Sequence, residues 1–523
     1  MSTTIQSTSV QPFTNEPISD YRKEENARAM REAIAKVRRE LGREYDLVIG
    51  GKRIKTAEKI RSINPAKPSE VVGIHQKAGR EHVEPAMEAA LAAFETWKFA
   101  SLEQRVGLLR RTADILRRRK FDFNAWLVLE VGKNWDEAEA DTVEAIDFLE
   151  LYAHQAEVLD RAVPITQLPG ERGYLRYIPL GVGAVIPPWN FPNAIALGMT
   201  AASVVCGNTV ILKPSSDSPT IAAKFFEAME EAGLPPGVVN FCPGSGATFG
   251  NGVVEHPKTR YIAFTGSKDV GLEINERAAK TAKGQIWIKR TILEMGGKDS
   301  IVVDADADLD SAVAGVAASA FGFQGQKCSA CSRAIVHEAI YDEFLNKLKA
   351  SVEQIPIGSP EDNVRMGPVV NEGAMQSILN YIEVGKKEGR LITGGTRVEG
   401  EGYCIRPTVI ADLAPDARLS QEEIFGPVLA VIKAKDYDDA LKIANNTEYG
   451  LTGAVYTRGE EKIERAKREF HVGNLYINRK CTGAVVGANP FGGFNMSGTD
   501  SKAGGTDYLY LYSQAKSIGQ KLG

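Results

Sequence analysis

The sequence has 523 residues, of which 43% are hydrophobic and 25% are charged, and its formal net charge at pH 7 is -4. This composition is typical of a soluble globular chain with roughly three structural units. The near-neutral charge, without clusters of basic residues, argues against nucleic acid or an anionic membrane as the main partner. No apolar run has the length of a membrane span, and the polar residues 1–20 do not resemble a signal peptide, so we expect a cytoplasmic protein.

The N-terminal part of the chain is predicted to be mainly helical. Charged residues and strong helix formers dominate residues 21–44, which indicates a largely solvated helix with a narrow apolar stripe, and we assign 1–45 to an N-terminal helical arm. A hairpin is expected about Gly50 and Gly51, and the apolar period is helical from 81 to about 158.

Residues 178–294 alternate between strand-like apolar runs and amphipathic helices, which is the pattern of a doubly wound parallel sheet in an α/β fold. With residues 46–160 they are predicted to form a Rossmann-like dinucleotide-binding domain. No G-x-G-x-x-G motif follows the first strand, and the glycine-rich stretch 244–250 has the wrong spacing. Ligands bind beyond the carboxyl ends of such strands, where Lys213 and the turn at 264–267 are expected.

A second alternation, residues 295–490, predicts a second α/β lobe that carries a candidate nucleophile. A helical run stops at Gly322 and Gly325, so Cys328 should lie on an exposed turn before the next strand. Backbone N–H groups on that turn would favour a thiolate and later an oxyanion, although a cysteine is more often a small buried hydrophobe. The cleft between the two lobes is the expected active site.

Two further segments predict an element that projects from the lobes. Residues 161–177 contain a Pro-Gly turn between strand-like arms, and the aromatic, strand-like stretch 500–523 is expected to pair with them. Because exposed strand edges favour pairing, we expect a homo-oligomer, either a dimer or an assembly of dimers.

The six cysteines are too sparse for a disulfide framework. Cys328 and Cys331 form a C-x-x-C, but no second such pair and no histidine pair accompanies it, so we expect no metal site. His337 gives only a weak case for a Cys-His dyad. A disulfide between Cys328 and Cys331 would block the candidate nucleophile reversibly.

Seven short segments stand in the order found in the aldehyde dehydrogenase superfamily, which the chain resembles over nearly its whole length. They are PWNFP at 188–192, KPS at 213–215, FTGS at 264–267, EMGGK at 294–298, GQKCS at 325–329, EEIFGP at 422–427 and NPFGGFNMSG at 489–498. The resemblance implies an NAD-dependent dehydrogenase with two lobes and a covalent cysteine mechanism.

The catalytic roles follow from this resemblance. Cys328 would attack the aldehyde carbonyl as a thiolate, and the Asn190 side-chain amide with the Cys328 backbone N–H would hold the oxyanion. Glu294 would be the general base that activates water against the thioester. Without the resemblance, Glu294 would be interpreted as an exposed loop acid.

The resemblance also implies the contacts to the cofactor. Lys213 would reach the adenosine ribose, and Ser267 the pyrophosphate. The other expected contacts are Ile186, Pro187, Pro188, Trp189, Ser216, Gly266, Glu423 and Phe425, of which Glu423 and Phe425 would meet the nicotinamide ribose and ring. Many NAD-preferring relatives have a glutamate where this chain has Ser216. A serine does not repel a 2'-phosphate, so NADP is an alternative cofactor.

Three features resemble the branch of this family that oxidises L-glutamate γ-semialdehyde to L-glutamate in proline breakdown: Ser329, the loop 482–487 and the stretch 496–505. In that branch the serine hydroxyl and backbone N–H groups, here those of Gly483 and Ala484, hold the substrate carboxylate without an arginine.

The same resemblance places Phe191 and Phe491 beside the aliphatic chain of the substrate. Glu144 would meet its ammonium group, unless the helix around Glu144 is only a charged, solvated face. The alternatives are another semialdehyde dehydrogenase, such as the succinic type, or a thioester hydrolase without dehydrogenase activity.

Overall fold

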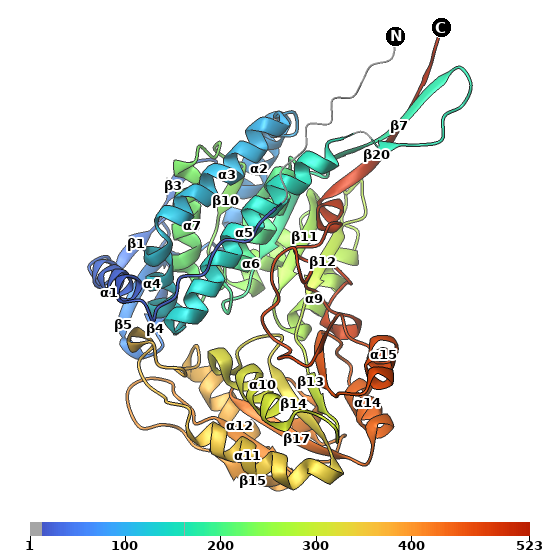
Figure 1. Cartoon of the computed structure of the whole chain (residues 1–523). Coiled ribbons are helices and arrows are strands. Elements are labelled where there is room, and N and C mark those ends of the chain that lie inside the picture. The colour runs from blue at the N-terminus through green and yellow to red at the C-terminus, as the bar shows by residue number, and fades with distance from the viewer. Residues whose placement is uncertain (1–12, 162) are drawn as a thin grey trace.

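The computed structural model describes residues 13–161 and 163–523, which form two lobes and a projecting arm (Figure 1). Each lobe is built on a seven-stranded sheet. Separate hydrophobic clusters lie on the two faces of each sheet, so helices and loops cover both faces. This arrangement confirms the predicted two-lobed α/β fold. None of the helices in these described ranges is long and apolar enough to cross a membrane.

The sheet of the first lobe has the order β12-β11-β8-β9-β10-β2-β3, in which β12 to β10 are parallel. Its strands are β2 (Leu47–Ile49), β3 (Lys52–Ile54), β8 (Val182–Ile186), β9 (Thr209–Leu212), β10 (Val239–Phe241), β11 (Thr259–Thr265) and β12 (Arg290–Glu294). β8, β9 and β10 are buried along their whole length, as their continuous apolar sequences predict. The antiparallel β2 and β3 form the predicted hairpin, where Gly50 and Gly51 have positive φ.

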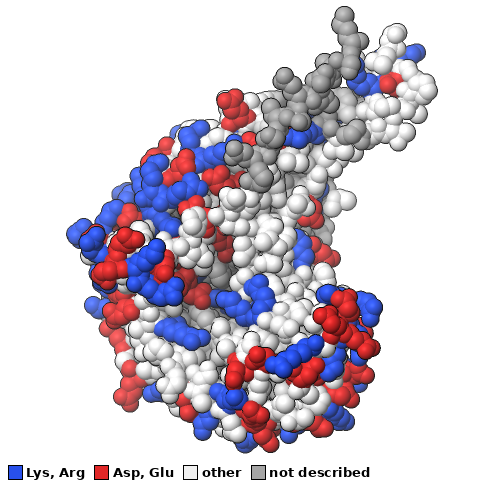
Figure 2. All heavy atoms as spheres, in the orientation of Figure 1, with Lys and Arg blue, Asp and Glu red and all other residues white. Residues whose placement is uncertain are grey.

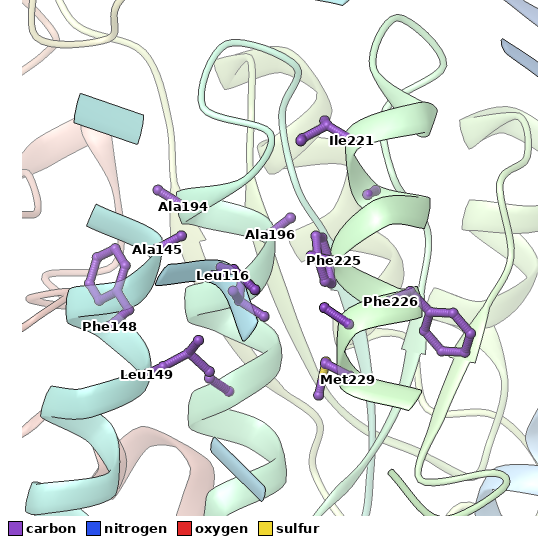
Figure 3. Close-up of a cluster of buried hydrophobic side chains, with 14 of the residues drawn as sticks. Leu116, Ala145, Phe148, Leu149, Ala194, Ala196, Ile221, Phe225, Phe226 and Met229 are labelled. Carbon is purple, nitrogen blue, oxygen red and sulfur yellow. The ribbon is translucent and has the colours of Figure 1, made fainter. Parts of the chain in front are cut away.

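The helices of the first lobe pack against this sheet and against each other. They are α2 (Val83–Trp97), α3 (Leu102–Arg118), α4 (Lys120–Val131), α5 (Trp135–Leu159), α6 (Ala194–Val205), α7 (Pro219–Glu231), α8 (Asn251–Glu255) and α9 (Lys268–Ala279). Figure 3 shows apolar side chains of α5, α6 and α7 meeting in one layer. At Gly198 of α6, a Cβ would lie 3.0 Å from the Phe148 ring of α5, so glycine permits the close approach of these helices.

A small sheet, β1-β5-β4, joins the N-terminal region to this lobe. Its strands are β1 (Arg43–Tyr45), β4 (Lys59–Asn64) and β5 (Lys67–Gln76). The helix α1 (Glu24–Arg38) precedes them and buries a stripe that includes Met30 and Ile34, while its charged residues face outward. The described part of the expected N-terminal arm therefore has the predicted narrow apolar stripe; residues 1–12 lie outside the described residues.

The sheet of the second lobe has the order β15-β16-β17-β14-β13-β18-β19. Its strands are β13 (Asp299–Val303), β14 (Cys331–His337), β15 (Arg390–Thr393), β16 (Thr408–Ala411), β17 (Val428–Ala434), β18 (Thr452–Tyr456) and β19 (Asn474–Ile477). Its helices are α10 (Leu309–Phe321), α11 (Tyr341–Glu353), α12 (Glu372–Glu388), α13 (Arg418–Gln421), α14 (Tyr437–Asn445) and α15 (Glu460–Glu469). Only β15 runs antiparallel, at the edge. On the face shown in Figure 2, basic and acidic side chains are interspersed over both lobes.

The arm consists of β6 (Val163–Pro164), β7 (Glu171–Pro179) and β20 (Ser513–Lys521) and extends away from both lobes (Figure 1). β7 turns back from β6 at Gly170 and pairs antiparallel with β20 along its full length. The expected pairing of the C-terminal stretch with the hairpin is therefore present. The expectation that this whole stretch is a strand is wrong in part, because Tyr508–Tyr512 is a 3-10 helix that buries Tyr508 and Tyr512 in the first lobe.

Candidate active site

One cavity of about 550 Å³ lies beyond the carboxyl ends of β8, β9 and β11 and reaches the second lobe. Its wall contains all ten residues predicted to contact the cofactor: Ile186, Pro187, Pro188, Trp189, Lys213, Ser216, Gly266, Ser267, Glu423 and Phe425. The same wall contains Asn190 and Cys328. The structure thus brings the candidate nucleophile and the candidate nucleotide site into a single groove, which we call the cofactor groove.

Cys328 lies on the turn between α10 and β14, as predicted. The turn Gly322–Gly325 holds Phe323 and Gln324 at positive φ (46° and 56°), and a Cβ at Gly325 would lie 2.3 Å from the Gly426 carbonyl oxygen. Non-glycine residues at positive φ are strained, and such strain gathers at functional sites.

Cys328 is less exposed than predicted, and its surroundings oppose the expected thiolate. Its side chain is only partly accessible. Burial raises the pKa of the Cys328 thiol well above its usual range, and the carboxylates of Asp299, Glu423 and Glu294 raise it further. The Ser329 backbone N–H acts in the other direction but does not offset burial. Burial therefore disfavours the thiolate of Cys328, which is the form that acts as a nucleophile.

Asn190 follows β8 and sits beside the turn of the nucleophile. Its Nδ2 donates to the carbonyl oxygen of Gln326 at 3.0 Å, two residues before Cys328, and its side chain is buried. An amide group has two N–H donors. One donor is used by this bond, which orients the side chain in the wall of the groove.

Glu294 ends β12, and its side chain is buried. The Ser501 hydroxyl donates to Glu294 Oε1, whereas Oε2 has no hydrogen-bond partner within the described ranges. Burial raises the pKa of Glu294 to about 8, against the opposing effects of Ser501 and Lys502. Glu294 does not line the cofactor groove. The interpretation of Glu294 as an exposed acid is therefore wrong, and its carboxyl group points to the segment that follows Gly498.

Several groups of the cofactor groove are shaped for a polar ligand. Glu423 Oε1 accepts from the Gly297 N–H at 3.0 Å, and burial raises its pKa to about 7. Ser267 is the N-cap of α9 and lines the groove, so the N-terminus of this helix lies beside it. Burial lowers the pKa of Lys213 to about 8, and its Nζ donates to the Pro214 carbonyl at 3.1 Å.

Sequence reasoning missed some residues of this groove. Gly246, Ala247 and Gly250 line it, although the spacing of their glycine-rich stretch does not match a dinucleotide motif. They form a π-helical turn after β10, and their position directly after a buried strand was the available signal. Asp217, next to Ser216, also lines the groove and accepts from Asn371 Nδ2 at 3.0 Å. A carboxylate is thus present in this wall one position after Ser216, the position at which many NAD-preferring relatives have a glutamate.

Three of the predicted substrate residues, Ser329, Gly483 and Ala484, belong to or adjoin the loop 482–487, which we call the anchor loop. The Ser329 carbonyl oxygen accepts from Thr452 Oγ1 (3.4 Å) and Cys481 Sγ (3.5 Å), which connects the nucleophile's turn to the start of this loop. Arg479 Nη2 donates to the carbonyls of Thr482 and Gly483, at 3.2 and 3.1 Å. These bonds use carbonyl groups, so the N–H groups of Gly483 and Ala484 remain available.

The other predicted substrate residues lie in the first lobe or on the C-terminal segment. Phe191 lies below Lys133, whose Nζ is 3.9 Å from the ring centroid. Phe491 forms an antiparallel bridge with Ala503. Glu144 is partly buried on α5, and burial, followed by the nearby Asp141, raises its pKa to about 8. The interpretation of its helix as a solvated face is wrong, since most residues of α5 are buried.

Cys328 and Cys331 are both free thiols in the structure. Cys331 starts β14 and is buried in the second-lobe cluster that also contains Cys481. Its Sγ donates to the Arg333 carbonyl at 3.4 Å. Cys331 is thus a packed core residue rather than a second thiol of the groove.

Comparisons with known proteins agree with this geometry. A sequence model of the aldehyde dehydrogenase family matches residues 53–518. The 1-pyrroline-5-carboxylate dehydrogenase of Geobacillus thermodenitrificans (strain NG80-2) is 57% identical over 512 residues, which cover 98% of this chain and 99% of the relative. The protein of the same name from Geobacillus kaustophilus (strain HTA426) is 58% identical with the same coverage.

Solved structures give the same result. The crystal structure of 1-pyrroline-5-carboxylate dehydrogenase from Thermus with bound NAD matches with a TM-score of 0.97 and 53% identity, over 98% of this chain and 100% of the other. Proline utilization A from Bdellovibrio bacteriovorus matches with a TM-score of 0.96 and 46% identity, over 98% of this chain and 53% of that longer protein. The chain therefore belongs to the aldehyde dehydrogenase family.

Proposed function

We propose that this protein oxidises L-glutamate γ-semialdehyde, the open form of 1-pyrroline-5-carboxylate, to L-glutamate with NAD as the oxidant. The reaction is the second step of proline breakdown. The observation that carries this proposal is the single groove that contains both Cys328 and the predicted cofactor contacts. Relatives 57% and 58% identical over nearly the whole chain have the name of this enzyme, which supports the choice of substrate.

The shape of the groove fits a dinucleotide. A Cβ at Gly296 would lie 2.2 Å from Glu423 Oε2, so glycine keeps the space beside this carboxylate open. Glu423 would accept from ribose hydroxyls, the N-terminus of α9 would face the pyrophosphate, and Lys213 would contact the adenosine ribose. When bound, NAD supplies the hydride acceptor.

The residues of the chain would perform the remaining chemistry. Once deprotonated, Cys328 adds to the aldehyde carbon, and the second N–H of Asn190 stabilises the oxyanion, an effect worth about a hundredfold or more in rate. Loss of hydride from that carbon leaves a thioester on Cys328. Glu294, turned from Ser501 toward the thioester, removes a proton from water, and the resulting attack releases glutamate and the thiol.

The substrate carboxylate would lie in the anchor loop, against the N–H groups of Gly483 and Ala484 and the Ser329 hydroxyl. Phe191 and Phe491 would pack beside its methylene groups. Glu144 has no hydrogen bond or ion pair to another of the described residues, which leaves its carboxyl group available for the substrate ammonium.

The experiment that tests this function compares NADH formation from 1-pyrroline-5-carboxylate and from succinic semialdehyde. We expect kcat/KM to be higher for 1-pyrroline-5-carboxylate. A preference for succinic semialdehyde would assign the chain to the succinic type, and thioester hydrolysis without reduction of any nicotinamide cofactor would identify it as a hydrolase.

The same proposal includes a second cofactor, an oligomeric state and a compartment. NADP is a possible second cofactor, since Ser216 has no carboxylate that would repel a 2'-phosphate. The projecting arm, with its exposed edge, supports a homo-oligomer of dimeric units, which light scattering would measure for the full chain. The six cysteines are too sparse for a disulfide framework, which supports action in the cytoplasm.

A further inference from the structure

The segment 13–16, which we call the N-terminal clasp, connects the long helix α5 to the anchor loop. Asn15 Nδ2 donates to Asp147 Oδ2 of α5 at 2.8 Å and to the carbonyl oxygen of Val486 at 2.9 Å. One side-chain amide thus joins a rigid helix to the C-terminal part of the loop, although the two partners are separated by more than half of the chain.

A second contact of the clasp lies next to the first. A Cβ at Gly487 would be 3.2 Å from Phe13 Cε1, so the Phe13 ring packs directly on this glycine. Gly487 has φ +78°, a conformation that favours glycine, and the preceding Val486 is buried. The last two residues of the anchor loop are therefore fixed by packing as well as by a hydrogen bond.

The clasp is itself held firmly against the first lobe. The Glu16 N–H donates to Asp147 Oδ1 at 2.7 Å, and the Glu16 carboxylate pairs with Arg117 Nε at 2.8 Å. Farther along, the Ser19 N–H donates to Glu139 Oε1 at 2.7 Å. Because the clasp is bonded both to α5 and to Val486, it holds the end of the anchor loop at a defined place relative to α5.

The opposite end of the anchor loop has its own supports, from Arg479 and Cys481. Gly483 and Ala484 lie between these supports and the clasp. Gly483 and Val485 are exposed, so few packing contacts restrain the middle of the loop. A loop with fixed ends keeps its N–H groups in one arrangement, and a carboxylate site made of such groups depends on that arrangement.

We propose that the N-terminal clasp positions the anchor loop for the substrate carboxylate, with Asn15 as the positioning residue. This inference rests on the proposed function, because it assigns the loop to the carboxylate. Asn15 itself does not line the cofactor groove. Its loss should weaken the binding of substrates that carry the carboxylate and leave the chemistry at Cys328 intact.

The test compares Asn15→Ala with Glu16→Gln, which removes the ion pair of the same segment to Arg117 but keeps the contact to Val486. We expect Asn15→Ala to raise KM for glutamate semialdehyde about 3- to 10-fold, as the loss of one or two hydrogen bonds implies, with little change in kcat. KM for propanal, which has no carboxylate, should stay unchanged. Glu16→Gln should resemble the wild type for both substrates, because the Glu16 N–H bond to Asp147 and the two Asn15 bonds still hold the clasp. Phe13→Ala should act in the same direction as Asn15→Ala.

Equal KM values for glutamate semialdehyde in Asn15→Ala and wild type would overturn the proposal. A similar rise of KM for both aldehydes would also overturn it, because that result indicates a general structural role. Amide hydrogen exchange over 482–487 is an independent measurement: the proposal requires faster exchange in Asn15→Ala than in Glu16→Gln, even if the wild type does not oxidise glutamate semialdehyde. If the wild type does not oxidise glutamate semialdehyde, the proposed function is wrong. If amide exchange over 482–487 is also unchanged in Asn15→Ala, the positioning role of the clasp is wrong as well.

Discussion

The Ser501 hydroxyl donates to Glu294 Oε1, so the candidate general base is held by a residue of the segment that follows Gly498. Burial raises the pKa of Glu294 to about 8, and the Ser501 hydrogen bond and the Lys502 charge lower it. With this pKa the carboxyl group is mostly protonated at neutral pH, so its capacity to activate water depends on pH.

A change at Ser501 should consequently shift the pH profile. In the wild type, thioester hydrolysis should increase as the pH rises through about 8, because only the deprotonated carboxylate accepts a proton from water. Ser501→Ala removes a hydrogen bond that favours the charged form, so the rising limb should move to higher pH. The measurement is kcat against pH under conditions where hydrolysis limits turnover, with Ser497→Ala as the control. A profile that does not move would show that Ser501 does not influence the base.

Replacement of the base itself should separate the two halves of the reaction. Glu294→Gln should still form the thioester but hydrolyse it slowly, so about one NADH per active site should appear in a rapid burst, followed by a turnover rate lower by roughly a hundredfold or more. Stopped-flow absorbance would record the burst. Full turnover in this variant would assign water activation to another group.

Replacement of Cys328 should affect the activity, whereas replacement of Cys331 should affect the stability. Cys328→Ala should lower kcat by at least about a thousandfold, because the covalent route is lost, while NADH binding measured by fluorescence stays close to that of the wild type. Cys331→Ala removes a buried core side chain and should reduce the melting temperature with little change in kcat. Loss of activity in Cys331→Ala without loss of stability would contradict its placement in the core.

Cofactor choice should respond to charge at Ser216. Ser216→Glu places a carboxylate in the wall of the groove next to Asp217, which should lower kcat/KM for NADP about tenfold or more and affect NAD much less. Ser216→Gln has nearly the same size without the charge and is the matched control. If Ser216→Glu and Ser216→Gln lower kcat/KM for NADP relative to NAD by the same factor, the effect is steric, and the electrostatic interpretation of this position is wrong.

The acid stability of the fold should depend on His75. Burial lowers the pKa of His75 to about 3, and its ring stacks on Tyr45 with centroids 4.7 Å apart. The unfolded chain binds a proton at this side chain near pH 6.5, while the folded chain does not, so His75 destabilises the fold progressively as the pH falls from 6.5 toward 3. The contribution amounts to about 1.4 kcal/mol per pH unit in the steep region.

His75→Gln should therefore reduce the pH dependence of the free energy of unfolding below pH 6.5, whatever its effect at neutral pH. Denaturant titrations at several pH values measure this slope, and His154→Gln on α5 is the control. An unchanged slope in His75→Gln would show that other groups dominate acid unfolding.

The sequence predicted the parts of this structure that depend on local pattern. Continuous apolar strands such as β8 and β9 are recognisable because both of their faces are covered, and the turn before Cys328 is marked by Gly322 and Gly325. The residues of the groove could be predicted from the family resemblance, because the short segments that define the family contain most of the residues that line the groove.

The features that the sequence did not predict depend on contacts between distant segments. The burial that raises the pKa of Cys328 comes from the surrounding structure, and the contact of Asn15 with Val486 has no signal in either segment alone. Tyr508–Tyr512 has the composition of a strand, but burial of its tyrosines against the first lobe favours a 3-10 helix, an example of tertiary packing that overrides local preference.

The pairing of β7 with β20 has a consequence for biosynthesis. Glu171 is paired with Lys521, so the ribosome produces one strand of the arm long before the other. Until β20 has been made, β7 has an unpaired edge, and contacts between such distant segments form late. The first lobe also lacks the buried Tyr508 and Tyr512 during that interval. The pairing of β7 can therefore be completed only after β20 has been synthesised, and a chain that lacks β20 should be prone to aggregate through the edge of β7.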